Sequence, residues 1–204
     1  YSPTSEIGKK AKSTPFGSLD RPFSPLALAL GAGATFIARS VDVIQPHLKT
    51  TLRRVASHQG TAFTEILQNC NIFNDGAWRD FTDRDVRDER MLFLEHGEPL
   101  IFGKERDKGI RLNGLHPEVV TIGEDGITEA DLLVHDQHAE DPYLALILSR
   151  MFWPDFPVPV GILREVDRPT HSDLIDEQIQ QAKARAGEGD LATVLLAGET
   201  WTVT

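Results

Sequence analysis

The segment Thr61-Ala62-Phe63-Thr64-Glu65-Ile66-Leu67 is typical of a buried β-strand, and the polar stretch Gln68–Gly76 that follows it contains Cys70, the single cysteine of the chain. The asparagines of this stretch are poor strand formers, so the chain should turn here, and their amide groups could surround the sulfur with N–H donors. Two interpretations of Cys70 are open at this point. One is a small buried apolar residue, which is the usual role of a lone cysteine, and the other is a sulfur ligand to a metal.

Upstream of this strand, the sequence predicts a strand, a helix and a second strand within about thirty residues, the length of a parallel crossover unit. Residues 35–41 have the residue types of a strand, Pro46 can open a helix, and Gly60 can end it. Such units build the parallel sheets of α/β proteins, whose sites lie beyond the carboxyl ends of the strands. Cys70 follows the second predicted strand and so lies beyond a carboxyl end of this kind.

The first residues predict a loop followed by a short helix. Residues 1–23 are rich in Ser, Thr, Pro, Gly and Lys and show almost no apolar periodicity. Lys9, Lys10 and Lys12 there could contact an anion or simply be solvated. Ser24 and Pro25 then form an N-cap and a first helical position, and the helix should continue to Ala34.

Beyond Gly76 the pattern predicts an appended region of short strands and helices. Residues 82–88 should form a short helix, and residues 142–151 another that Asp141 caps. Residues 152–159 combine aromatics with prolines, which favours an extended arm. The expected short strands are residues 91–94, 99–103, 108–112, 119–122 and 132–135, and the last apolar segments are an amphipathic helix over 172–186 and a stretch over 191–197.

Composition excludes several classes of protein. The formal charge of -10 argues against nucleic-acid binding, which depends on Lys and Arg. The charge is +5 over residues 1–60 and -15 over the rest. No apolar run reaches the roughly 18 residues of a membrane span, and one cysteine fits a reducing compartment, so we expect a cytoplasmic protein without a membrane partner.

The other residues of the sequence give little indication of a catalytic or metal site. His135-Asp136-Gln137-His138 offers two imidazoles, but no further ligand stands at a familiar spacing, so a solvated surface is favoured over a metal site. There is no nucleophile-elbow serine, phosphate loop or paired zinc motif. The residues alone do not show a complete active site.

An ordered series of segments resembles the β subunit of 2-oxoacid:ferredoxin oxidoreductases. It begins with Tyr1-Ser2-Pro3-Thr4-Ser5 and Lys12-Ser13-Thr14-Pro15-Phe16-Gly17-Ser18 and continues through Phe36-Ile37-Ala38-Arg39 and Gly60–Ile66 to Gln68–Gly76. Residues 96–103, 108–109 and 134–136 resemble the C-terminal region of that subunit, so that the resemblance covers most of residues 1 to about 165.

The resemblance implies a fold class, a division of the chain and a reaction. The fold is the C-terminal part of an α/β thiamine-diphosphate-binding fold with a parallel sheet (residues 1–67), then a β-subunit extension (68–165), then a C-terminal helix and tail (166–204). The family joins a 2-oxoacid to thiamine, releases carbon dioxide, passes electrons through a [4Fe-4S] cluster to ferredoxin and delivers the acyl group to coenzyme A. The residues of this sequence at Gln68–Gly76 resemble most the members that use 2-oxoglutarate, which favours 2-oxoglutarate over pyruvate as the 2-oxoacid.

By the same resemblance, Cys70 falls on the fourth of the four cysteines that hold the cluster, which makes it a metal ligand rather than an inert thiol. The other three cysteines and the Gly-Asp-Gly motif for the diphosphate and Mg²⁺ lie upstream in the family and are not in this sequence. We therefore expect a fragment that works only with its missing half and an α subunit, and that alone is neither active nor cofactor-loaded. The alternative is a short noncatalytic paralogue that acts as a binding or assembly module.

Overall fold

The computed structural model describes residues 2–72, 74–199, 201 and 203. The chain divides into two compact units, Tyr1–Asp167 and Arg168–Thr204, and each is described by itself. No helix among the described residues is both long and apolar enough to cross a membrane.

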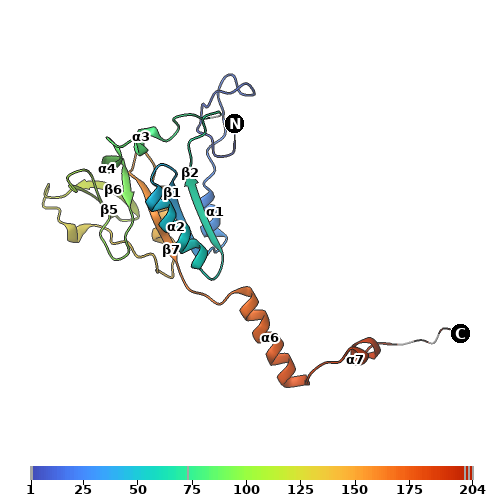
Figure 1. Ribbon diagram of the computed structural model, residues 1–204. Coiled ribbons are helices and arrows are strands. Elements are labelled where there is room, and N and C mark those ends of the chain that lie inside the picture. Colours follow the sequence, from blue (N-terminus) through green and yellow to red (C-terminus); the bar gives the residue numbers. More distant parts are fainter. Residues whose placement is uncertain (1, 73, 200, 202, 204) are drawn as a thin grey trace. The chain divides into compact units, whose positions relative to one another are not determined.

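The first unit is built on a mixed four-stranded sheet in the order β2-β1-β7-β3 (Figure 1). β1 (Phe36–Val41) pairs in parallel with β2 (Ala62–Leu67), as predicted, and the crossover helix is α2 (Gln45–Ser57). On its other side β1 pairs antiparallel with β7 (Val158–Glu165), which pairs in parallel with β3 (Met91–Phe93). The prediction of an α/β protein is confirmed, and the sheet is mostly but not wholly parallel, because β7 runs against β1. β2 is an edge strand in which only Leu67 is buried, so the prediction of a buried strand is wrong.

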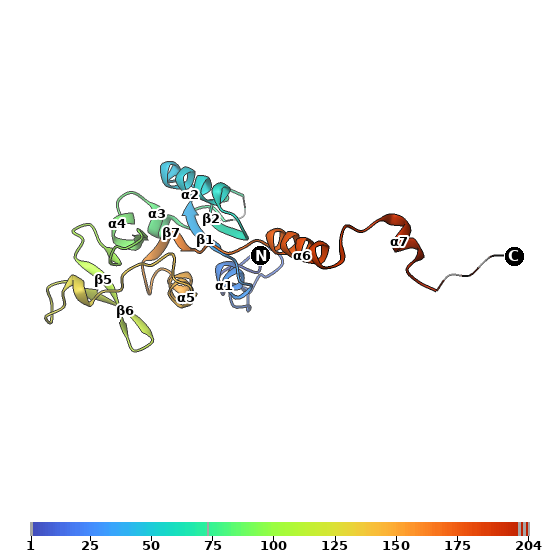
Figure 2. The same cartoon turned by 90° about the horizontal axis from the view of Figure 1, so that it is seen from below.

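Helices cover both faces of this sheet (Figure 2). α2 lies on one face, while α1 (Pro25–Gly31) and α5 (Tyr143–Arg150) pack against each other on the opposite face. α1 starts as predicted, since the Ser24 hydroxyl accepts a hydrogen bond from the Ala27 amide at 3.3 Å and proline opens the helix. α5 instead begins after Pro142, which has no capping side chain, so Asp141 is not its N-cap.

A second, antiparallel sheet has the order β4-β5-β6, with β4 at Ile101–Phe102, β5 at Lys108–Asn113 and β6 at His116–Thr121. These are the short strands that the sequence predicted. The expected strand over 132–135 is reduced to a single bridge between Val134 and Pro99, and the 3₁₀ helix η1 (Glu129–Asp131) precedes it.

Two other predictions for this region are wrong. The helix expected over 82–88 is split into α3 (Arg79–Thr82) and α4 (Arg87–Arg90), with turns between them. The extended arm expected over 152–159 ends at Val158, where the chain enters β7, a central strand of the main sheet. The region after Gly76 is thus not simply appended, because β3 and β7 complete the sheet that β1 and β2 begin.

The core of the first unit consists of three apolar clusters. The largest joins α1, α5, Ile37 and Leu163 to Phe102 and Ile110 of the second sheet and to Leu100, the residue before β4. A second cluster surrounds Val41, Leu67 and Phe81, and a third lies over the antiparallel sheet. The two sheets therefore share a continuous core.

The second unit consists of α6 (His171–Ala186) and α7 (Leu191–Leu196). Thr170 and Asp173 form a reciprocal capping box at the start of α6. The described residues of both helices are all outside the buried class.

Candidate functional site

Two loops meet at the carboxyl ends of β1 and β2, the edge at which the sequence predicted a site. Asp42 follows β1 directly, and the Gln68–Gly76 stretch follows β2. The Asp42 carboxylate accepts a hydrogen bond of 3.1 Å from the Asn69 backbone amide. This contact fixes the direction in which the chain leaves β2.

The side chain of Asn69 determines the shape of the cysteine loop, by which we mean residues 68–76. Its amide nitrogen donates to Asn71 Oδ1 at 2.7 Å and to Asp75 Oδ1 at 2.9 Å, and its oxygen accepts from the Gly76 amide at 2.8 Å. The loop is therefore closed by its own side chains, as Asx residues commonly do in turns.

Cys70 lies on this loop and is partly exposed. Its carbonyl accepts a 2.9 Å hydrogen bond from the Asn74 amide, which forms a one-residue bridge across the loop. The indole of Trp78 donates to the Gln68 carbonyl at 3.1 Å and anchors the start of the loop. These contacts hold the backbone on both sides of Cys70.

The N-terminal loop packs onto the cysteine loop through one lysine. Lys9 Nζ donates to Asn74 Oδ1 and forms an ion pair of 3.0 Å with Glu6. Hydrogen bonding by its own backbone amide lowers the pKa of Glu6, and Lys9 lowers it further. The sequence offered Lys9, Lys10 and Lys12 as equal candidates for a contact. It could not single out Lys9, because its partner Asn74 lies 65 residues away in the chain.

A buried ion pair lies behind the loop, between β1 and β2. Arg39, which is 3% exposed, donates from Nε to Glu65 Oε2 at 2.6 Å and from Nη2 to the Ser149 carbonyl at 3.2 Å. Its guanidinium also lies 5.6 Å from the centre of the Phe152 ring. The pair links both strands of the crossover to α5.

His47, which follows β1 at the start of α2, was not among the candidate residues that the sequence indicated. His47 Nδ1 is 2.8 Å from the hydroxyl of Ser40, a fully buried residue of β1. Its ring also makes an edge contact with Phe93, and burial lowers the pKa of His47. The only sequence signal was its position in the first turn of α2.

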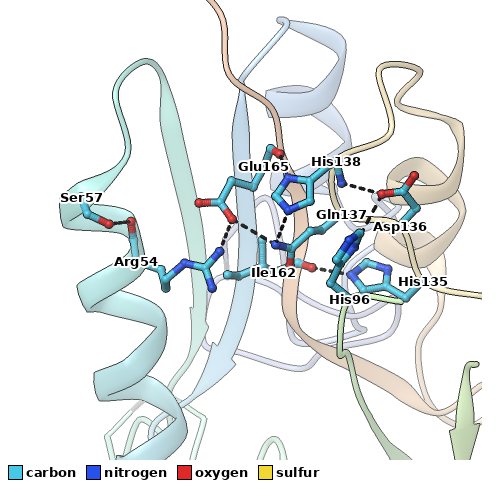
Figure 3. A network of polar contacts seen from close by, with 9 residues as sticks. All are labelled: Arg54, Ser57, His96, His135, Asp136, Gln137, His138, Ile162 and Glu165. Atoms are coloured by element: carbon cyan, nitrogen blue, oxygen red, sulfur yellow. Dashed lines mark hydrogen bonds and ion pairs between the residues drawn. The ribbon is translucent and has the colours of Figure 1, made fainter. Parts of the chain in front are cut away.

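The predicted solvated surface at residues 135–138 is wrong for His135, which is 1% exposed (Figure 3). Its Nε2 is 2.8 Å from the Ile162 carbonyl of β7, and burial lowers the pKa of His135. Within the described residues, no three His, Cys, Asp or Glu side chains are grouped closely enough to hold a metal ion. These histidines are structural neighbours of β7 and lie apart from the cysteine loop.

Comparison with protein-family models finds no match. The 2-oxoglutarate oxidoreductase subunit KorB of Mycobacterium tuberculosis is 42% identical over 206 residues, which cover 100% of this chain and 54% of that relative. A 2-oxoacid:ferredoxin oxidoreductase β subunit of Saccharolobus solfataricus is 35% identical over 85 residues, which cover 42% of this chain and 28% of that relative.

A solved structure has a similar fold. The match to a 2-oxoglutarate:ferredoxin oxidoreductase from Magnetococcus marinus, solved with 2-oxoglutarate, coenzyme A and succinyl-CoA bound, has a TM-score of 0.63 at 22% identity. It covers 98% of this chain and 53% of that one. Both the KorB subunit and the solved structure match nearly the whole of this chain, which spans about half of their own length.

Proposed function

Because this chain is a homologue of 2-oxoacid:ferredoxin oxidoreductase β subunits, we propose that it acts within such a subunit in the oxidative decarboxylation of a 2-oxoacid. The supporting observation is the 42% identity to a 2-oxoglutarate oxidoreductase subunit along the whole of this chain. The name of that relative also supports 2-oxoglutarate as the substrate in preference to pyruvate. The products would be an acyl-coenzyme A, carbon dioxide and reduced ferredoxin.

The role of this chain in the reaction is to build one wall of the cofactor site. Residues 1–67 correspond in this proposal to the C-terminal part of the thiamine-diphosphate fold, and the carboxyl ends of β1 and β2 face the cofactors. Thiamine diphosphate with Mg²⁺ would supply the carbanion chemistry, and a [4Fe-4S] cluster would accept single electrons. The partners would be the α subunit and ferredoxin.

We assign to Cys70 the role of one cluster ligand. Its place on a fixed loop just after β2 fits a ligand that must be held in one orientation, and the thiolate is the form that binds iron. The sequence contains one cysteine, so three further thiolates must come from outside it. Asn69 and Lys9 would act as positioning residues, because they hold the loop and do not supply sulfur.

An activity assay of the complex between the α subunit and a whole β subunit that contains this chain tests the proposed function. We expect 2-oxoglutarate to support reduction of a low-potential viologen dye only when coenzyme A is present, with pyruvate at least tenfold less effective as roughly one missing carboxylate contact would predict. A complex that binds the α subunit and reduces no dye with either 2-oxoacid would instead support a noncatalytic assembly module.

Iron and acid-labile sulfide analysis tests the assignment of Cys70. Cys70→Ser should lower the iron and sulfide content of the purified complex, while Ile72→Ser in the same loop should leave both unchanged, since Ile72 is 84% exposed. Equal iron in the wild-type and Cys70→Ser complexes would remove Cys70 from the ligands.

A further inference from the structure

Three histidines gather where the antiparallel sheet meets the end of β7, in a group that the proposed function does not use (Figure 3). We call this group the histidine corner and define it as His96, His135, Asp136, His138 and Glu165. The His135 amide donates to the Glu98 carbonyl at 2.9 Å, and its carbonyl accepts from Gly97 at 2.8 Å. Leu133, two residues earlier, donates to the Ile110 carbonyl of β5 at 2.8 Å. The segment 133–138 therefore connects β5 to β7.

The hydrogen bond of His135 to β7 requires one form of the ring. A carbonyl can only accept, so Nε2 must carry the proton that it shares with Ile162 O at 2.8 Å. In a neutral ring Nδ1 then has no proton, and this buried atom has no hydrogen-bond partner among the described residues. A proton added to Nδ1 would place a charged, unsatisfied N–H in the core.

Hydrogen bonds also tie the His138 ring to the end of β7. Its Nδ1 lies 2.6 Å from the Glu165 carbonyl and must donate to it, so Nε2 is left to accept from the Gln137 amide at 3.0 Å. The His96 ring lies 4.6 Å from the His138 ring.

The carboxylates around His135 are already engaged. Asp136 Oδ1 is 3.6 Å from His96 Nδ1 at the surface. The Glu165 carboxylate forms an ion pair with Arg54 of α2 and accepts from Gln137 at 3.2 Å. Arg164 of β7 adds positive charge and donates to the Glu140 carbonyl at 2.7 Å.

We propose that the histidine corner is an acid-sensitive joint, in which protonation of His135 releases residues 133–138 from β7. The step moves one proton from solvent to Nδ1 and breaks no covalent bond. Glu165 N to Gln137 O, at 2.6 Å, is the backbone contact that this release opens.

Proton linkage gives the direction in which the stability of the closed joint changes with pH. Burial lowers the pKa of His135 below its usual value; the Ile162 hydrogen bond and Asp136 oppose the shift, while His96 and His138 reinforce it. The released state then binds more protons than the closed state. The closed joint has its full stability above the ordinary histidine pKa of about 6.5 and loses stability as the pH falls below it, by at most about tenfold in the opening constant per pH unit for one proton.

Hydrogen exchange measured by mass spectrometry tests the joint. After correction for intrinsic rates, amides of residues 133–138 and 162–165 should exchange faster at pH 5.5 than at pH 7.5, by up to about tenfold for one proton. In His135→Gln, whose side-chain amide can still donate to Ile162 without titrating, this pH dependence should disappear. His116→Gln, an exposed change on β6, should behave like the wild type.

Unchanged pH dependence in His135→Gln would overturn the proposal. If this variant does not fold, the wild-type chain decides by nitrogen-15 NMR of its histidines. The proposal requires that His135 keeps the neutral ring protonated on Nε2 until the segment opens. A His135 that becomes charged while residues 133–138 stay protected would contradict it.

Discussion

At the scale of single residues, side chains from distant parts of the chain fix the loop that carries Cys70. Asn69 closes the loop internally, and Lys9 joins it to the N-terminal loop through Asn74. The asparagine-rich composition predicted a turn, because these side chains bond to nearby backbone. The choice of Lys9 among three lysines could not be predicted, since it depends on a contact between segments that only the folded chain brings together.

Loss of the lysine should loosen both loops. In Lys9→Met we expect amides of residues 6–18 and 68–76 to exchange several-fold faster, because the tie to Asn74 and the ion pair with Glu6 are both removed. Lys10→Met is the matched control, since Lys10 is the exposed neighbour. Equal exchange in the two variants, measured by mass spectrometry, would show that Lys9 does not hold the cysteine loop.

His47 should add to acid instability on its own. Burial lowers the pKa of His47, so the unfolded chain binds a proton more readily, and the free energy of unfolding should fall as the pH drops below about 6.5. His47→Asn keeps a short polar side chain near Ser40 and should flatten this fall in urea titrations between pH 7.5 and 5. If the free energy of unfolding falls with pH as steeply in His47→Asn as in the wild type, groups other than His47 cause the fall.

At the scale of elements, the crossover β1-α2-β2 followed from the sequence because its apolar pattern is local, whereas β7 did not. β7 contains Pro159 and Gly161, which are typical of edges or breaks, yet it lies between β1 and β3. A register shift between Ile37 and Ala38 accommodates it against β1. The pairing connects segments more than a hundred residues apart, and no local pattern encodes it.

Gly161 lets β7 lie close to Leu94, the residue after β3, and its replacement should be costly. Gly161 has φ of 127°, and an added Cβ would lie 3.1 Å from the backbone oxygen of Leu94. We expect Gly161→Ala to lower the free energy of unfolding by about 2 kcal/mol or more, because both strain and overlap arise. Gly189→Ala, where no atom lies within 4 Å, should change it by less than about 0.5 kcal/mol in the same urea titration.

The ion pair between β1 and β2 should matter far more than a surface pair. Glu65→Gln leaves the buried Arg39 without its counter-charge and should cost about 3 kcal/mol of unfolding free energy. Glu118→Gln breaks the half-exposed pair with Arg111 in the β5–β6 hairpin and should cost less than about 1 kcal/mol. Similar losses in the two variants would contradict the view that Arg39 depends on Glu65.

At the scale of the whole molecule, the α/β class was predictable, while the joining of the two sheets was not. The sequence separated residues 68–165 as an extension, but Leu100, Phe102 and Ile110 share the largest core cluster with α1 and α5. The His135–His138 stretch is polar in sequence, which predicted solvent exposure. His135 and Gln137 are buried because β7 lies beside them, whereas Asp136 and His138 are exposed.

We propose that Cys70 is one of four ligands of an iron–sulfur cluster that receives electrons from a 2-oxoacid. Low-temperature electron paramagnetic resonance of the complex between the α subunit and a whole β subunit that contains this chain, mixed with 2-oxoglutarate and coenzyme A without ferredoxin, tests this most directly. We predict a reduced-cluster signal in the wild type that Cys70→Ser loses and Ile72→Ser keeps. An identical signal in the wild type and Cys70→Ser would contradict the claim.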